Sequence, residues 1–310
     1  MPRSLEGRFP TRERPTWVGH VGLQERIETA YGLLEACRLC PRRCGVNRLK
    51  GEKGFCRSGL LPIISSYGPH FGEERPLVGL RGSGTIFFTH CNLGCVFCQN
   101  YDISHGGHGR EISLEQLADL MVELQEEGCH NLNFVTPTHF SAQILAALPQ
   151  AIAQGLNLPL VYNCGGYESL EVLGLLEGLF DIYMPDLKFA DSQIGQAYCA
   201  VPDYFEVARE ALKEMHRQVG DLLMDERGIA QRGLLIRHLV LPNGLAGTQE
   251  AMEFLAHEVS RHTYVNLMDQ YRPCYEASRH APLNRRITRA EFEEALRITQ
   301  QAGLYRLDGF

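Results

Sequence analysis

A chain of 310 residues is long enough to form one large domain or two small ones. Hydrophobic residues make up 44% of the chain and charged residues 22%, which is an ordinary balance for a globular enzyme with a large core. The formal net charge of −7 argues against a general nucleic-acid binder, and no apolar run approaches the roughly 20 residues that a membrane helix needs. We therefore expect neither a nucleic-acid partner nor a membrane partner.

The eleven cysteines are the most informative part of the composition. The arginine-rich first fifteen residues hold no apolar core, so we interpret them as a disordered arm rather than a secretory signal. Clustered thiols without a signal favour the cytoplasm, a reducing compartment where such thiols serve metals or catalysis. Four cysteines are scattered and are expected to be small buried hydrophobic side chains: Cys129, Cys164, Cys199 and Cys274.

A first cysteine group precedes the rest of the predicted core. It holds four members: Cys37, Cys40, Cys44 and Cys56. Four thiols fit a closed zinc site or a second iron–sulfur cluster, and their spacing does not separate the two. We expect a four-cysteine metal-binding segment over residues 36–80, after an arm and a helix over residues 1–35. A cluster there would relay electrons or shape the substrate entrance.

A second cysteine group follows the apolar, β-branched run Gly84–Thr89, which predicts a buried strand. Its three thiols lie on one short loop, at Cys91, Cys95 and Cys98. Thiolates are the preferred ligands of iron–sulfur clusters, and three of them can hold three corners of a four-iron cluster. The fourth iron would keep an open site for a substrate. A zinc loop completed by His90, or three reduced thiols, is the alternative.

Phe97 completes the pattern Cys-x3-Cys-x-aromatic-Cys, which resembles the signature of the radical S-adenosylmethionine (SAM) superfamily. The resemblance implies a [4Fe-4S] cluster whose fourth iron binds the amino and carboxylate groups of SAM. The reduced cluster would cleave SAM, and a 5′-deoxyadenosyl radical would abstract hydrogen from a substrate. The resemblance also places Phe97 against the adenine and implies an electron donor such as a flavodoxin or ferredoxin.

Strand and helix patterns alternate after this loop. Five further strands are predicted, at residues 131–136, 158–163, 180–187, 233–241 and 264–270. Helices are predicted at residues 113–128, 141–155, 168–179, 202–219, 248–260 and 287–301. Six β–α units are too few for a closed eight-stranded barrel, so we predict an α/β fold, a partial (β/α)6 open barrel of radical SAM type with an N-terminal cysteine-rich extension. The barrel would span residues 81–275, and a C-terminal helix and tail would span residues 276–310.

Active sites of such folds gather at the carboxyl ends of the strands. The second strand ends in Thr136-Pro-Thr138, where many radical SAM enzymes carry a Gly-Gly-Glu stretch that receives the SAM amino group. The glutamate is absent here, so we expect oxygens of Thr136 and Thr138 in its place; a proline turn with a helix cap is the alternative. The third strand ends at Asn163, and Gly165 and Gly166 follow it, where glycines let the backbone approach a ligand or form a tight turn.

The fourth strand ends in Met184-Pro-Asp186-Leu-Lys188. This stretch is similar to one in the activating enzymes of glycyl-radical proteins, where Met-x-Asp contributes to a cation site beside the SAM carboxylate. Asn163 stands where those enzymes offer an aspartate, and a structural ion pair of Asp186 with Lys188 is the alternative. In the fifth strand, the planar guanidinium of Arg237 suits the SAM carboxylate.

Together these stretches resemble the pyruvate formate-lyase activating enzyme-like family over about residues 35–305. That resemblance implies hydrogen abstraction from a glycine of a protein substrate. Activating enzymes with extra clusters insert the added cysteines after the SAM loop, whereas this chain has none between Cys98 and Cys129. A small-molecule or peptide substrate is therefore a second expectation, and a non-catalytic metal-binding or electron-transfer protein is a third. No catalytic side chain is singled out.

Overall fold

The structure, a computed structural model, describes residues 22–309. The expected N-terminal arm falls largely on residues 1–21, outside this described part. The strands are β1 (Ile63–His70), β2 (Ser83–Phe88), β3 (Arg110–Glu111), β4 (Leu132–Val135), β5 (Leu160–Cys164), β6 (Ile182–Pro185), β7 (Leu223–Met224), β8 (Ala230–Leu239), β9 (Tyr264–Met268) and β10 (Arg306–Leu307). They form one ten-stranded sheet in the order β10-β9-β8-β6-β5-β4-β2-β1-β3, with β7 paired to β8.

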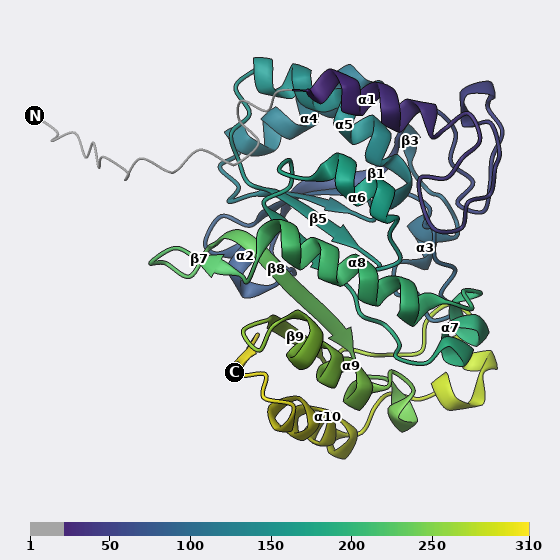
Figure 1. The fold of residues 1–310 in the computed structure, drawn as a ribbon, viewed down its shortest axis with the longest axis vertical. Coiled ribbons are helices and arrows are strands. Elements are labelled where there is room, and N and C mark those ends of the chain that lie inside the picture. The colour runs from purple at the N-terminus through teal and green to yellow at the C-terminus, as the bar shows by residue number, and fades with distance from the viewer. Residues whose placement is uncertain (1–21, 310) are drawn as a thin grey trace, which may run out of the picture.

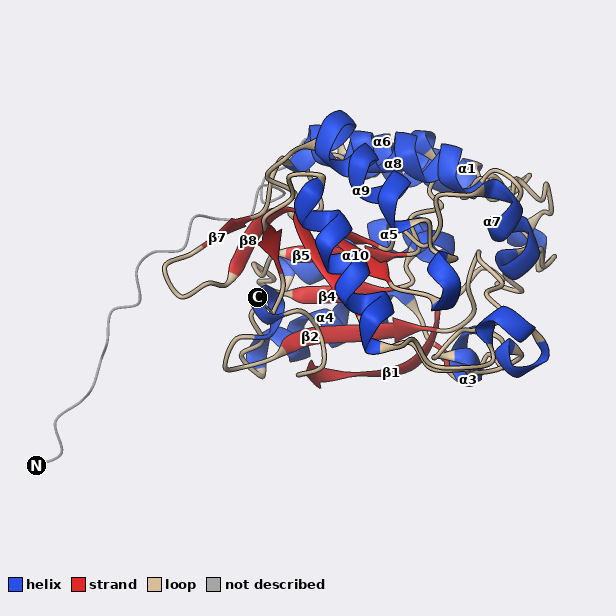
Figure 2. Cartoon of the chain, turned by 90° about the horizontal axis from the view of Figure 1, so that it is seen from below, coloured by secondary structure: helices blue, strands red, loops and turns tan. Residues whose placement is uncertain are grey.

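Six neighbouring strands of this sheet, β2, β4, β5, β6, β8 and β9, run parallel, and these are the six strands expected from the sequence. The sheet curves without closing, so the prediction of an open, partial (β/α)6 barrel is confirmed. Figure 2 shows the curved sheet with α6, α8 and α9 lying outside it. The carboxyl ends of the six parallel strands therefore meet at one rim, as such a fold requires.

The helices are α1 (Leu23–Gly32), α2 (Arg75–Val78), α3 (Tyr101–Ser104), α4 (Leu114–Glu126), α5 (Ser141–Ala153), α6 (Leu170–Leu176), α7 (Ser192–Cys199), α8 (Tyr204–Val219), α9 (Thr248–Phe254) and α10 (Arg289–Gln301). Helix α4 begins with a capping box of Ser113 and Gln116, and it buries Leu117, Met121 and Leu124 on one face. In Figure 1, α1 lies beside α5, which it contacts. Among residues 22–309, no helix has the length and apolar character needed to cross a bilayer.

Strand β1 was not expected, because it lies within the segment over residues 36–80. It pairs antiparallel with β2 through register partners such as Tyr67 and Ile86. The second half of that segment therefore contributes a strand to the barrel sheet. Because β1 is antiparallel, the connection from β1 to β2, with α2 in it, lies at the amino ends of the parallel strands.

The two faces of the sheet bury different side chains, because successive residues of a strand point to opposite faces. The outer face carries Tyr162 and Tyr183, which pack with Phe180 beneath the helices. The inner face carries a smaller cluster that includes Val161, Met184 and, from α2, Leu77. Helix α2 therefore packs against the concave side of the sheet and forms the floor of the barrel.

Candidate active site

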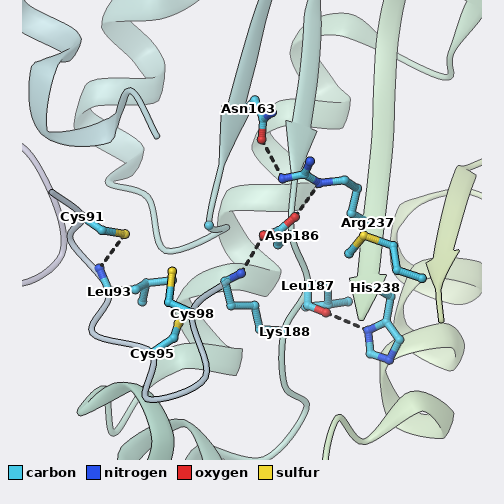
Figure 3. Close-up of polar contacts among 12 residues, drawn as sticks. Cys91, Leu93, Cys95, Cys98, Asn163, Asp186, Leu187, Lys188, Arg237 and His238 are labelled. Atoms are coloured by element: carbon cyan, nitrogen blue, oxygen red, sulfur yellow. Dashed lines mark hydrogen bonds and ion pairs between the residues drawn. The ribbon is translucent and has the colours of Figure 1, made fainter. Parts of the chain in front are cut away.

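The three-cysteine loop leaves the carboxyl end of β2 and lies at the rim of the barrel. His90 takes a left-handed backbone conformation with φ of 63° directly before Cys91. The Val96 amide then donates to the carbonyl oxygen of Tyr198, which ties the loop to α7 at 2.9 Å. In Figure 3 the loop faces the ends of β6 and β8 across a gap that contains the Lys188 side chain.

Each loop thiol has its own polar neighbour. The Cys91 sulfur accepts a hydrogen bond from the Leu93 amide at 3.3 Å, and the Cys98 sulfur lies 3.1 Å from the Ser104 hydroxyl. Burial raises the pKa of Cys91 and of Cys98 above the ordinary value for a thiol. Among the described residues, no three His, Cys, Asp or Glu side chains converge as the ligands of a metal ion do.

Cys199 contributes a fourth thiol at this place. It was expected to be a small buried hydrophobic side chain, and it is fully buried. Its Sγ, however, donates to the Cys95 sulfur at 3.0 Å, and this hydrogen bond lowers the pKa of Cys95. Only the fold reveals this neighbour, because no local pattern joins two cysteines that are 104 positions apart.

A cavity of about 180 Å³ opens beside the loop. Cys95, Phe97 and Cys98 line one side of it, while Asp186, Lys188 and Arg237 line the opposite side. The donor set fits an iron–sulfur cluster in kind, because three soft thiols, one buried and two half-buried, share one loop and two of them border this cavity. Phe97 packs edge-on against Phe189 and Tyr271 while it borders this cavity.

The predicted strand-end residues come together as one charged group. Asp186 accepts from the Lys188 ammonium and from Arg237 Nε, at 2.6 Å each. Arg237 also donates to Asn163 Oδ1 at 2.7 Å, as Figure 3 shows. Burial by itself would raise the pKa of Asp186, but Arg237 and Lys188 outweigh burial and hold the pKa below its usual range. The ion pair given as the structural alternative is therefore present, and its members also line the cavity.

Two further acidic residues, Glu73 and Glu74, face Arg237 from the barrel floor. Their carboxylate oxygens lie 3.7 and 3.9 Å from Arg237 Nη1. Sequence reasoning missed both residues, because they precede α2 in a connection far from any strand end of the predicted barrel. Their only local signal is that two adjacent acidic residues interrupt a short connection between two strands.

Thr138 lies elsewhere than expected. Its hydroxyl donates to Glu168 Oε1 at 2.7 Å, and Glu168 also accepts from the Tyr162 hydroxyl at 3.0 Å on the outer face of the sheet. The Thr138 side chain therefore points under the helices and away from the cavity, because Glu168 is buried there and needs donors. Thr136 adopts a positive φ of 60°, and its amide donates to the Asn163 carbonyl at 2.8 Å.

The glycines after β5 are required by packing of the chain against itself. A Cβ on Gly165 would lie 2.6 Å from Cδ1 of Leu93 in the cysteine loop. Gly166 has a φ of +79°, and a Cβ there would lie 2.4 Å from the Asp186 carbonyl oxygen. These close approaches bring the end of β5 against both the cysteine loop and the end of β6.

The upstream cysteines lie in an irregular segment beside the loop. Cys37, Cys40 and Cys56 are buried and Cys44 is exposed, and the eleven cysteines of the described part form no disulfide. Burial raises the pKa of Cys40 to about 12, and the nearby Cys56 acts in the same direction. Gly54 lies so close to Cys44 that a Cβ would be 2.3 Å from the Cys44 sulfur.

Arg42 joins this segment to the cysteine loop. Its guanidinium donates to the carbonyl oxygens of Asn92, Cys199 and Ala200, and it stacks 3.4 Å above the Phe55 ring. Asn92 lies between Cys91 and Cys95, so one side chain of the upstream group holds the backbone of the loop. The two cysteine groups, separate in the sequence, are structural neighbours.

An open barrel of six parallel strands with three thiols on the loop after its first strand defines a class of enzyme that uses an iron–sulfur cluster and SAM. Residues 85–224 match the model of the radical SAM superfamily. An uncharacterized protein of Methanocaldococcus jannaschii is 35% identical over 300 residues, which cover 92% of this chain and 80% of that protein. The chain belongs to the radical SAM superfamily, and membership implies a [4Fe-4S] cluster and SAM.

Three solved structures are also similar to parts of this chain. A domain of pyruvate-formate lyase-activating enzyme from Bacteroides vulgatus is 17% identical, with a TM-score of 0.37 over 63% of this chain and 91% of that domain. The protein anSMEcpe with bound AdoMet is 11% identical, with a TM-score of 0.47 over 71% of this chain and 58% of that chain. SuiB of Streptococcus suis, bound to the precursor peptide SuiA, is 12% identical, with a TM-score of 0.46 over 71% and 46% of the two chains.

Proposed function

We propose that this protein is a radical SAM enzyme in which Cys91, Cys95 and Cys98 hold a [4Fe-4S] cluster beside a SAM site at the barrel rim. The observation that carries the proposal is the cavity with thiols on one side and the charged strand ends on the other. When bound, the cluster and SAM would supply a radical that abstracts hydrogen from a substrate inside the barrel. A flavodoxin or ferredoxin is the proposed electron donor.

The strand-end side chains are proposed to bind and orient SAM. Lys188 is a partly buried cation at the cavity, and Asp186 raises its pKa well above the ordinary value although burial opposes its charge. Lys188 and Arg237 offer donors to a carboxylate, and Asn163 and Asp186 offer acceptors to an amino group. Phe97 contributes an aromatic wall on the loop side of the same cavity.

Two substrate classes follow from this proposal. The Met184–Lys188 stretch favours a glycine of a partner protein, because it is similar to the stretch in glycyl-radical activating enzymes. The polar interior of the barrel around Arg237 favours a small molecule or a peptide side chain that carries polar groups. Electron paramagnetic resonance of candidate glycyl-radical partners, incubated with the reduced enzyme and SAM, separates the two classes.

The central experiment removes one loop thiol. Anaerobically purified, reduced wild-type enzyme is expected to form 5′-deoxyadenosine from SAM, and Cys95→Ala is expected to lose both the cluster absorbance and this product. Formation of 5′-deoxyadenosine by Cys95→Ala would refute the assignment. Cys129→Ala is the matched control, because Cys129 is a buried thiol outside the site.

We further propose that Cys37, Cys40, Cys44 and Cys56 bind a second metal centre, either zinc or an iron–sulfur cluster. Three of these thiols are buried in an irregular segment, which a metal would hold together. Iron, zinc and acid-labile sulfide are measured in a variant with Cys91, Cys95 and Cys98 all changed to Ala. Residual iron with sulfide would identify a cluster, and zinc alone would identify a zinc site. The absence of both metals would contradict a second metal centre.

A further inference from the structure

The barrel floor carries two carboxylates that the SAM site does not use. Glu73 and Glu74 come from the connection before α2, yet their side chains are only 8% and 4% exposed and face the barrel interior. Asn266 of β9 donates to Glu74 Oε1 at 2.9 Å, and Asn163 of β5 donates to Glu73 Oε2 at 3.5 Å. Side chains from two non-neighbouring strands, β5 and β9, thus contact this pair.

The interior around these carboxylates has an excess of negative charge. Two cations, Arg237 and Lys188, face three carboxylates, and both cations make their closest contacts with Asp186. Glu73 and Glu74 share only the more distant Nη1 of Arg237. Burial raises the pKa of Glu73 to about 7 against the opposing effect of Arg237, which agrees with an undercompensated acidic pair.

Asn133 gives an independent sign that this floor receives a ligand. Its side chain is fully buried, and by register with Val161 it lies on the inner face of the sheet, beside Glu73. Among the described residues, Asn133 Oδ1 and Glu74 Oε2 have no hydrogen-bond partner, while the Asn133 amide faces Glu73 and acts to lower the pKa of that carboxyl. Buried polar atoms are nearly always partnered, so unpartnered ones that face one place point to a group that binds there.

The chemistry of the floor selects that group. Glu73 Oε2, Glu74 Oε2 and Asn133 Oδ1 are acceptors, so the complementary ligand donates several hydrogen bonds and carries positive charge. An alkylammonium group has three donors and one charge, which match this set. Arg237 lines the cavity and also contacts both glutamates, so the floor lies one side chain below the proposed SAM site.

We propose that Glu73, Glu74 and Asn133 form a receptor for a primary ammonium group of the substrate, which enters the barrel with its reacting carbon toward the rim. This inference rests on the proposed radical SAM function and names its substrate class: an amine, either a small molecule or a lysine side chain of a peptide. The receptor positions the substrate, and none of its members has a role in binding the cluster.

The test measures binding to the full-length, anaerobically reconstituted protein by isothermal titration calorimetry. Butylammonium and Nα-acetyl-lysine methylamide are the probes, and butanol and Nα-acetyl-norleucine methylamide are their neutral counterparts. Wild-type protein is expected to bind at least one ammonium probe and neither neutral counterpart. Binding of butylammonium indicates a small amine, and binding of the lysine probe alone indicates a peptide. If wild-type protein binds the charged and the neutral probes equally, the proposal is overturned, and no variant is needed for this result.

Glu74→Gln is expected to weaken ammonium binding by roughly ten- to hundredfold, as loss of a charge-assisted hydrogen bond predicts. Glu115→Gln, an exposed acidic residue on α4, is the matched control and is expected to bind like wild type. The SAM affinity of Glu74→Gln is measured alongside its ammonium affinity. A parallel loss of SAM affinity would overturn the proposal, because the floor would then hold the amino group of SAM. If wild-type enzyme does not cleave SAM, the proposed radical function is refuted instead. The ammonium-binding measurement is then interpreted separately.

Discussion

The thiol of Cys199 donates a hydrogen bond to the sulfur of Cys95 at 3.0 Å, so a residue at the end of α7 contacts the middle thiol of the loop. Hydrogen bonds to the sulfur ligands of a cluster stabilise its reduced form. Cys199 is therefore expected to adjust the loop cluster without being one of the three loop ligands.

The first prediction concerns this contact. Cys199→Ala is expected to keep the iron and sulfide content of the loop site and to lower the reduction potential of its cluster, because one hydrogen bond to a ligand sulfur is lost. An anaerobic redox titration followed by electron paramagnetic resonance measures the shift. An unchanged potential would contradict a role for this hydrogen bond, and loss of the cluster would make Cys199 a ligand.

The second prediction concerns Arg42, which supports three backbone carbonyls of the loop and of the end of α7. Arg42→Gln is expected to lower the free energy of unfolding by about 2 kcal/mol, because the partly buried carbonyls of Asn92 and Cys199 lose a charged donor. It is also expected to reduce iron loading of the cysteine loop. Urea unfolding and iron analysis measure the two effects. Arg38→Gln is the control, because within residues 22–309 the Arg38 side chain makes only an exposed ion pair with Glu171, and this variant should change neither quantity.

The third prediction concerns Glu168, whose pKa burial raises to about 7 from an ordinary 4.5. The folded state then binds more protons than the unfolded state between these two values, so stability falls as pH rises from about 4.5 to about 7. The loss attributable to Glu168 is expected to be roughly 3 kcal/mol. Glu168→Gln should flatten the curve of unfolding free energy against pH by that amount. Parallel curves for wild type and variant would show that Glu168 is ionised throughout this range.

The fourth prediction compares the two glycines after β5. Gly166→Ala is expected to destabilise the fold by about 3 kcal/mol, because a positive φ and a clash with the Asp186 carbonyl add together. Gly165→Ala clashes with the end of the flexible Leu93 side chain, has no positive φ and should cost less than half as much. Thermal and urea unfolding rank the two variants. If Gly165→Ala is the more destabilising variant, contact with the cysteine loop, and not backbone conformation, explains why these two positions are glycine.

Much of the architecture could be predicted because local sequence patterns indicate its strands and helices. The run Gly84–Thr89 and the capping box at Ser113 encode a strand and a helix within a few residues, and the six β–α units follow from such signals. Strand β1 was missed because its second half, Tyr67–His70, alternates weakly and contains Gly68 and Pro69. It is held in place by pairing with β2, which is a long-range contact.

The residues of the candidate site also divide into those that local patterns predict and those that only long-range contacts bring together. Cys91, Cys95 and Cys98 on one loop, and Asp186 and Lys188 two positions apart, are visible in the sequence because their spacing is itself the signal. Membership of the radical SAM superfamily follows from that loop and its strand.

Only the tertiary structure decided which distant groups join them. Glu73 and Glu74 lie near Arg237, and Thr138 faces Glu168 instead of the cavity, because burial forces each polar group to find a partner across strands that no local pattern connects. The sequence by itself thus determined the kind of chemistry, through ligands placed a few residues apart. The fold determined what surrounds that chemistry, because the interior of a barrel is assembled from residues that are distant along the chain.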